Sequence, residues 1–112
     1  MPKPGETPPL TPITFQVLIT LSEGPLHGYG VMRHVEESTG ARVGPGTVYG
    51  ALSRLQSRGW VEDAGEDASD PRRGSRFALT RAGRTALRAE ALRLHGLSEL
   101  ARRHRLLPED GE

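Results

Sequence analysis

The sequence predicts a mainly α-helical fold with one small β-hairpin and a long C-terminal helix. In four segments of the 112-residue chain, apolar residues recur at helical spacing. Between the third and fourth segments the pattern changes to the alternation of polar and apolar residues that is typical of strands. We therefore expect three helices, a hairpin and a final helix, in this order along the chain.

Three short helices are expected in the first half of the chain. Thr11 is a suitable N-cap for the first because Pro12 follows it at the first helical position. Glycines follow the second and third helices, where a left-handed C-terminal residue is favoured. The predicted bounds are Thr11-Pro12 to about Ser22, His27-Gly28 to Thr39-Gly40, and Gly46-Thr47 to Gly59. The expected inward residues are Ile13, Val17, Leu18 and Leu21, then Tyr29, Met32 and Val35, then Val48, Leu52 and Leu55.

A two-stranded hairpin is expected after Gly59. Trp60-Val61-Glu62 reads as its first strand, residues 63–74 as a long loop, and residues 75–80 as the returning strand. We expect Trp60 and Phe77 to pack beneath this hairpin rather than to stack on a ligand. A helical trio followed by such a hairpin has the order of a winged helix-turn-helix.

The final helix is expected over residues 81–107, with Thr80 as its N-cap. Gly96 interrupts the run and is expected to bend or weaken it. Leucines and one alanine form a seam that we assign to a dimer interface: Leu87, Leu94, Leu97, Leu100 and Ala101. The predicted organisation is a disordered arm over 1–10, a winged helix-turn-helix domain over 11–80, a dimerisation helix over 81–107 and an acidic tail over 108–112.

Composition excludes several classes of function. The chain has no cysteine, which removes disulfides and thiolate metal sites. No stretch approaches the roughly 18 apolar residues of a membrane span, and residues 1–9 lack the apolar region of a signal peptide. No nucleophile elbow, phosphate loop or paired catalytic carboxylates are present. We expect a cytoplasmic protein that is not an enzyme and has neither a cofactor nor a metal.

The net charge of +1 conceals an uneven distribution. Residues 77–105 carry seven arginines against two glutamates, whereas residues 60–76 carry three arginines against five acidic residues. The overall pI near 8.3 is a weak indicator of nucleic-acid binding. The local arginine clusters are the stronger one.

Three motifs resemble those of PadR-family transcriptional regulators. They are Glu23-Gly24-Pro25-Leu26-His27-Gly28-Tyr29-Gly30, Pro45-Gly46-Thr47-Val48-Tyr49-Gly50-Ala51-Leu52 with Leu55 and Gly59, and Arg76-Phe77-Ala78-Leu79-Thr80 with Ala82-Gly83 and Leu87. Ala78 departs from the family, which commonly has a second aromatic there. The short C-terminal region is similar to the compact subfamily with a single dimerisation helix. The resemblance covers about residues 10–90, and it implies a homodimer on double-stranded DNA and release by a small aromatic or drug-like effector.

Three groups of residues are candidates for contact with DNA. An α-helix fits the major groove, and the third helix is the candidate reader. The helix N-terminus at 27–29 is placed to meet a phosphate, and the wing arginines to meet phosphates or the minor groove. The residues are Gly46, Thr47, Tyr49, Gly50, Ser53 and Arg54, then His27, Gly28 and Tyr29, then Arg72, Arg73 and Arg76.

Other roles remain open for several of these residues. Tyr49 could be a partly buried core aromatic, Gly46 a turn residue and Arg54 a solvated side chain. His27 could be a cap or loop residue, and a metal role for it with His34 is disfavoured because no carboxylate cluster completes a site. We expect a repressor that binds a palindromic operator. The rival function is a protein-binding or RNA-binding winged helix.

Overall fold

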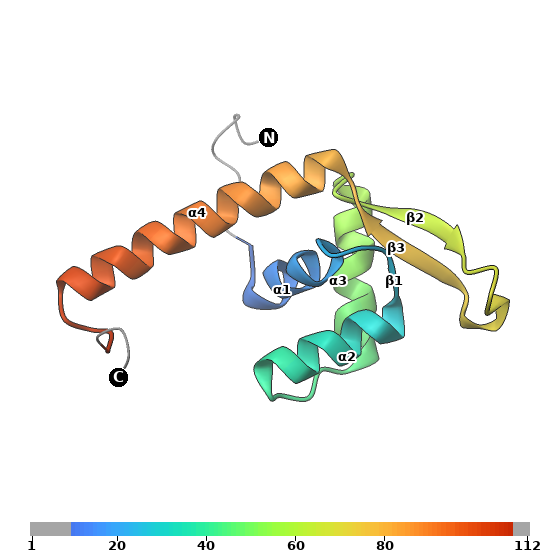
Figure 1. Cartoon of the computed structure of the whole chain (residues 1–112), viewed down its shortest axis with the longest axis horizontal. Helices are drawn as coiled ribbons and strands as arrows, with labels where there is room; N and C mark the ends of the chain where they lie inside the picture. The colour runs from blue at the N-terminus through green and yellow to red at the C-terminus, as the bar shows by residue number, and fades with distance from the viewer. Residues whose placement is uncertain (1–9, 109–112) are drawn as a thin grey trace.

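The structure, a computed structural model, describes residues 10–108 and has the predicted order of elements (Figure 1). Three helices precede the wing and one long helix follows it. A 3-10 turn, η1, lies within the wing. The elements are α1 (Pro12–Leu21), β1 (Leu26–His27), α2 (Gly28–Thr39), α3 (Pro45–Ser57), β2 (Val61–Glu66), η1 (Pro71–Arg73), β3 (Ser75–Leu79) and α4 (Arg81–Arg103).

The sheet has three antiparallel strands in the order β1-β3-β2, so the expected two-stranded hairpin is incomplete. The extra strand, β1, pairs Leu26 with Phe77 and His27 with Arg76. It was missed because two residues are too few to show an alternating pattern. The pairing ties the N-terminus of α2 to the wing.

The wing loop is shorter than expected because β2 continues to Glu66. The strand passes through an irregularity between Asp63 and Gly65, where Gly65 has a φ of 81° and its N–H donates to Asp63 Oδ1 at 2.7 Å. Hydrogen bonding to β3 needs no apolar side chains here, since both faces of this part of β2 are largely exposed. An acidic, glycine-containing segment therefore forms a strand that its composition does not predict.

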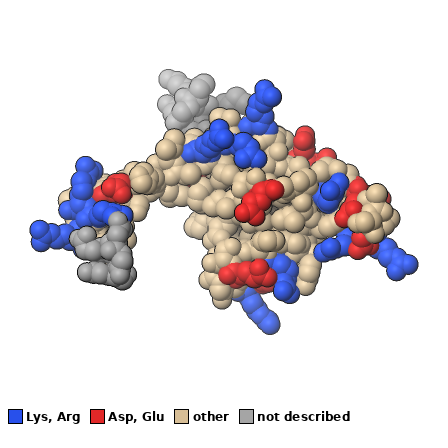
Figure 2. All heavy atoms as spheres, in the orientation of Figure 1, with Lys and Arg blue, Asp and Glu red and all other residues tan. Residues whose placement is uncertain are grey.

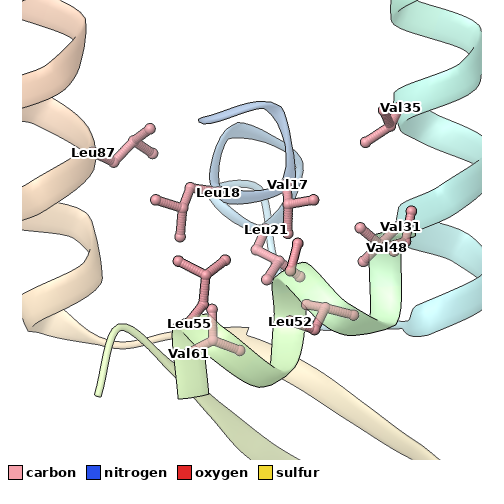
Figure 3. Packing of buried hydrophobic residues seen from close by; sticks show 11 residues of the cluster. Val17, Leu18, Leu21, Val31, Val35, Val48, Leu52, Leu55, Val61 and Leu87 are labelled. Carbon is pink, nitrogen blue, oxygen red and sulfur yellow. The ribbon is translucent and has the colours of Figure 1, made fainter. Parts of the chain in front are cut away.

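One apolar core joins the four helices to the base of the wing (Figure 3). On α2 the fully buried residues are Val31 and Val35, four positions apart, whereas Tyr29 is exposed and not inward as expected. The remaining buried members are Val17, Leu18 and Leu21 of α1, Val48, Ala51, Leu52 and Leu55 of α3, Val61 of β2, and Leu87 of α4.

Leu87 belongs to this core and not to the seam for a partner, which corrects the expectation. Its side chain is 8% exposed and lies in the same cluster as Leu18 and Leu55. The first half of α4 packs on α1, so an inward position there faces the chain's own core. Only the later positions of the expected seam remain open.

Both predicted N-caps form. The Thr11 hydroxyl oxygen accepts the Thr14 N–H at 3.2 Å, and the Thr80 hydroxyl oxygen accepts the Gly83 N–H at 3.0 Å. Thr80 also donates to the Gly59 carbonyl at 2.7 Å, which ties the end of the wing to the end of α3. These bonds set the direction in which α4 leaves the domain.

Helix α4 continues through Gly96 and ends at Arg103, earlier than expected. Arg105, with a φ of 58°, follows the end of the helix. Of the predicted arm only Leu10 is described; the rest, and residues 109–112 of the predicted tail, lie outside the described residues. Between residues 10 and 108, no helix is both long and apolar enough to cross a bilayer.

Candidate nucleic-acid interface

Helix α3 turns one face into the core and leaves the opposite face open. Its buried stripe is Val48, Ala51, Leu52 and Leu55. Gly46, Thr47 and Ser53 are exposed, and Gly50 is half-buried. Apart from Tyr49 the open face carries small or polar side chains, so the helix can approach a partner closely.

Tyr49 is held at the edge of this face by two contacts. Its ring lies so close over Gly28 that a Cβ there would be 2.4 Å from Cζ and Oη. It also meets the ring of Phe77 edge-on, with centroids 6.4 Å apart and an interplanar angle of 70°. Such edge-to-face pairs add about 0.5–1.5 kcal/mol beyond area burial. Because the side chain is still 47% exposed, Tyr49 is both a packing residue and a surface residue.

Gly28 and His27 are placed differently from the expectation. Gly28 is buried, and its role is to admit the Tyr49 ring rather than to face a phosphate. The His27 side chain is 8% exposed and none of residues 10–108 bonds either ring nitrogen, so the expected phosphate contact through this ring is corrected. Pairing of β1 with β3 causes this burial, and sequence reasoning missed it because it missed β1.

Tyr29 is the one residue of this group on the surface, with 53% of its side chain exposed. It lies in the first turn of α2 and hydrogen bonds with Arg33, one turn later, which raises the pKa of the Arg33 guanidinium. The two together place a hydroxyl and a positive charge near the start of α2.

The wing presents arginines among acidic residues (Figure 2). Arg72 and Arg73 are exposed in η1, whereas Arg76 is half-buried in β3 with its Nε 3.5 Å from the Gly65 carbonyl oxygen. Hydrogen bonds from the Ser69 hydroxyl and backbone lower the pKa of Asp67. Positive and negative side chains therefore lie within a few residues of one another at the tip, and the tip is not uniformly basic.

The C-terminal half of α4 projects beyond the other helices (Figure 1). Leu94, Leu97 and Leu100 are 37%, 50% and 45% exposed, and Ala101 is half-buried. Leu94, Leu97 and Ala101 continue the face that carries Leu87 in the core. An apolar stripe that begins in the core thus continues onto the surface.

Among residues 10–108, no three histidines, cysteines or acidic residues are grouped so as to hold a metal ion. The described side chains of the surface formed by α3, the start of α2 and the wing include hydroxyls, the phenols of Tyr29 and Tyr49, and guanidinium groups. These are the groups with which proteins contact phosphates and base edges.

Three helices, a three-stranded wing and an exposed third helix define a winged helix-turn-helix protein. The model of the transcriptional regulator PadR-like family matches residues 17–89. The chain belongs to this family of transcriptional regulators, as its three motifs predicted.

The chain is also similar to particular proteins in sequence or in fold. An uncharacterized 37.1 kDa protein in transposon TN4556 of Streptomyces fradiae is 41% identical over 87 residues, which are 78% of this chain but only 23% of that protein. A PadR-like transcriptional regulator of Bacillus cereus shares the fold, with a TM-score of 0.71 at 19% identity over 87% of this chain and 93% of that one. The fold is also similar to that of Bordetella bronchiseptica BpsR, with a TM-score of 0.67 at 24% identity over 80% of this chain and 59% of that one. That structure concerns the regulation of BpsR's DNA binding by 6-hydroxynicotinic acid.

Proposed function

We propose that this protein is a homodimeric repressor that reads a palindromic operator. It acts on DNA in the cytoplasm and is not an enzyme. The observation that carries the proposal is the open face of α3, on which Tyr49 is fixed by Gly28 and Phe77 while remaining 47% exposed. A rigid helix with small polar side chains suits entry into the major groove.

The α3 residues have distinct tasks in this proposal. Thr47 contacts a phosphate or a thymine methyl group, and the Tyr49 hydroxyl contacts the backbone. Gly46 and Gly50 allow close approach, since neither adds a side chain to the exposed surface. Further contacts come from Ser53 and Arg54 on α3, Tyr29 on α2, and Arg72, Arg73 and Arg76 on the wing.

A second copy of the chain covers the exposed stripe of α4. Full burial of a leucine contributes about 1.5–3 kcal/mol. Burial of Leu94, Leu97 and Leu100 against a second chain would therefore stabilise the dimer by several kcal/mol. A two-fold dimer would present two α3 helices about one DNA turn apart, which requires a palindromic site.

We also propose that a small effector releases the DNA, since the DNA binding of the structurally similar BpsR is regulated by a small molecule, 6-hydroxynicotinic acid. The described α4 contains no aromatic residue, which disfavours flat stacking on that helix. The effector therefore binds elsewhere or through polar groups.

The contacts are tested by measuring the affinity for a selected duplex by fluorescence anisotropy. Thr47→Ala and Tyr49→Phe each remove a hydroxyl, and each should weaken binding about two- to tenfold. Ser38→Ala removes an exposed hydroxyl that is bonded only to the His34 carbonyl, and should leave affinity unchanged. Unchanged affinity in both α3 variants, or a binding constant insensitive to salt, would contradict the proposal, because phosphate contacts release counterions.

Sedimentation of the protein tests the dimer separately. Leu97→Glu places a charge on the stripe and should give a monomer that binds the duplex weakly. Leu92→Glu, at a position that is 72% exposed and off the stripe, is the matched control and should remain dimeric. If the Leu97→Glu and Leu92→Glu proteins are both dimeric, α4 does not form the interface.

A further inference from the structure

A small cavity lies where the beginning of α1 meets the second half of α3. Its volume is about 100 Å³. The lining comes from both helices and the residues just before α1: Leu10, Thr11, Thr14, Arg54, Leu55 and Arg58. Among these described lining residues, both charged side chains are arginines and none is a carboxylate.

Within the described part of the chain, no carboxylate neutralises either arginine. Among residues 10–108, the ion pairs are made by Arg33, Arg93 and Arg102, and neither Arg54 nor Arg58 takes part in one. A positive charge beside a cavity with no counter-charge attracts an anion. Guanidinium groups bind oxyanions strongly because their donors match the geometry of carboxylate and phosphate oxygens.

Both arginines are exposed, and each guanidinium group has one neighbour that locates it. The Arg58 guanidinium lies 5.1 Å from the centroid of the Trp60 ring, in a cation–π arrangement. The Arg54 side chain runs back along α3, so that Nη1 is 3.5 Å from the position of a Cβ on Gly50. Arg54 therefore borders the cavity and the open face of α3 together.

The threonines add a further donor. The Thr11 hydroxyl donates to the Thr14 hydroxyl oxygen at 2.8 Å, and the Thr14 N–H donates back to Thr11 at 3.2 Å. The hydroxyl hydrogen of Thr14, a residue only 9% exposed, is thereby left to donate to another acceptor.

Glu90 is the carboxylate associated with this region, and it is already engaged. It accepts the N–H of Leu10 at 2.5 Å and forms an ion pair with Arg93. Both interactions lower the pKa of Glu90, the bond from Arg93 more strongly, against an opposing effect of burial. Since Arg93 compensates its charge, Glu90 is not the missing counter-ion of Arg54 and Arg58.

The volume limits the occupant. An apolar cavity of about 150 Å³ holds benzene, and sites for drug-sized ligands are roughly 300–1,000 Å³. A cavity of about 100 Å³ is too small for an aromatic ring with substituents. It suits a compact anion.

We propose that Arg54 and Arg58, with the Thr14 hydroxyl, form a binding site for a small free oxyanion, either inorganic phosphate or a short-chain carboxylate. The occupant bridges α1 and α3 and partly neutralises Arg54, which also borders the open face of α3. The site does not depend on DNA binding, and it can be tested without DNA.

The test is a titration of the full-length protein with inorganic phosphate, and separately with acetate, in low-chloride buffer, followed by backbone amide NMR shifts. Saturable shifts are expected at residues 11–14 and 54–58. Arg54→Gln/Arg58→Gln should weaken the affinity at least about tenfold, because two charge-assisted contacts are lost. Arg81→Gln/Arg88→Gln removes the same charge from exposed positions on α4 and should bind as the wild type does.

The outcomes separate the site from its alternatives. Equal weakening in the two double variants would reduce the effect to net charge and overturn the proposal, as would shifts that do not saturate. Benzoate binding at these residues as tightly as acetate would overturn the size argument. If the wild type binds neither anion, while the Arg54 and Arg58 variant loses affinity for a duplex, these arginines serve the DNA backbone and the proposed site is absent. Circular dichroism of each variant confirms that the fold is retained.

Discussion

Gly83 is the position at which a single methyl group should disturb the fold most. A Cβ there would be 2.1 Å from the Trp60 carbonyl oxygen and 2.9 Å from Leu79 Cδ1. The oxygen belongs to the backbone and accepts the Thr80 N–H at 3.0 Å, so it cannot move aside without loss of that bond. Gly83→Ala must therefore push the start of α4 away from the base of the wing.

The magnitude follows from three contributions. Overpacking costs about 1–3 kcal/mol, and the lost hydrogen bond about 0.5–1.5 kcal/mol. The better helix propensity of alanine returns about 1 kcal/mol. The net loss is centred on about 2 kcal/mol, which corresponds to a fall in Tm of about 8–16 °C for a domain of this size.

Thermal unfolding followed by circular dichroism, at one fixed protein concentration, measures this effect. Gly96→Ala is the matched control, since it lies in the same helix with nothing within 4 Å of the added Cβ. It should raise the Tm by a few degrees, because propensity alone acts there. A Gly83→Ala protein as stable as the wild type would refute the reasoning, as would a destabilised Gly96→Ala protein.

Two further predictions concern the wing joint and the N-terminal contact. Gly28→Ala should displace the Tyr49 ring, whose tip can swing outward, so the Tm should fall only slightly. Affinity for the duplex should fall about two- to tenfold, as expected for Tyr49→Phe, and unchanged affinity would contradict this. Glu90→Gln should lower stability at pH 7 by about 1 kcal/mol. The pKa of Glu90 is lowered from 4.5, so the stability it contributes is present above that pH and lost as the pH falls below it. The Tm difference from the wild type should accordingly shrink in acid, and a constant difference would argue against a role for the charge.

The order of the elements could be predicted because the spacing of apolar residues and the capping residues indicate each helix. Thr11 and Thr80 both cap as expected, since a hydroxyl before a helix satisfies a free N–H whatever the tertiary context. The family followed from motifs that combine these turns with the α3 stripe. Such signals are local, so one sequence suffices to read them.

The errors concern residues whose surroundings come from distant parts of the chain. His27 and Gly28 were assigned to a surface, but β3 and Tyr49 cover them. Leu87 and Leu94 are both apolar positions on the same face of α4, and only packing against α1 separates the core residue from the exposed one. The Arg54–Arg58 cavity could not be predicted for the same reason, since half of its lining comes from Thr14 of α1 and from Leu10 and Thr11 just before it.

The central claim is that two chains present paired α3 helices to DNA. Its most direct test is a binding selection from a randomised duplex library with the purified protein, followed by sedimentation of the complex. The account predicts enrichment of a palindrome whose half-sites are centred about one helical turn apart, with two chains on each duplex. Enrichment of no sequence, or a complex with a single chain on an asymmetric site, would contradict it.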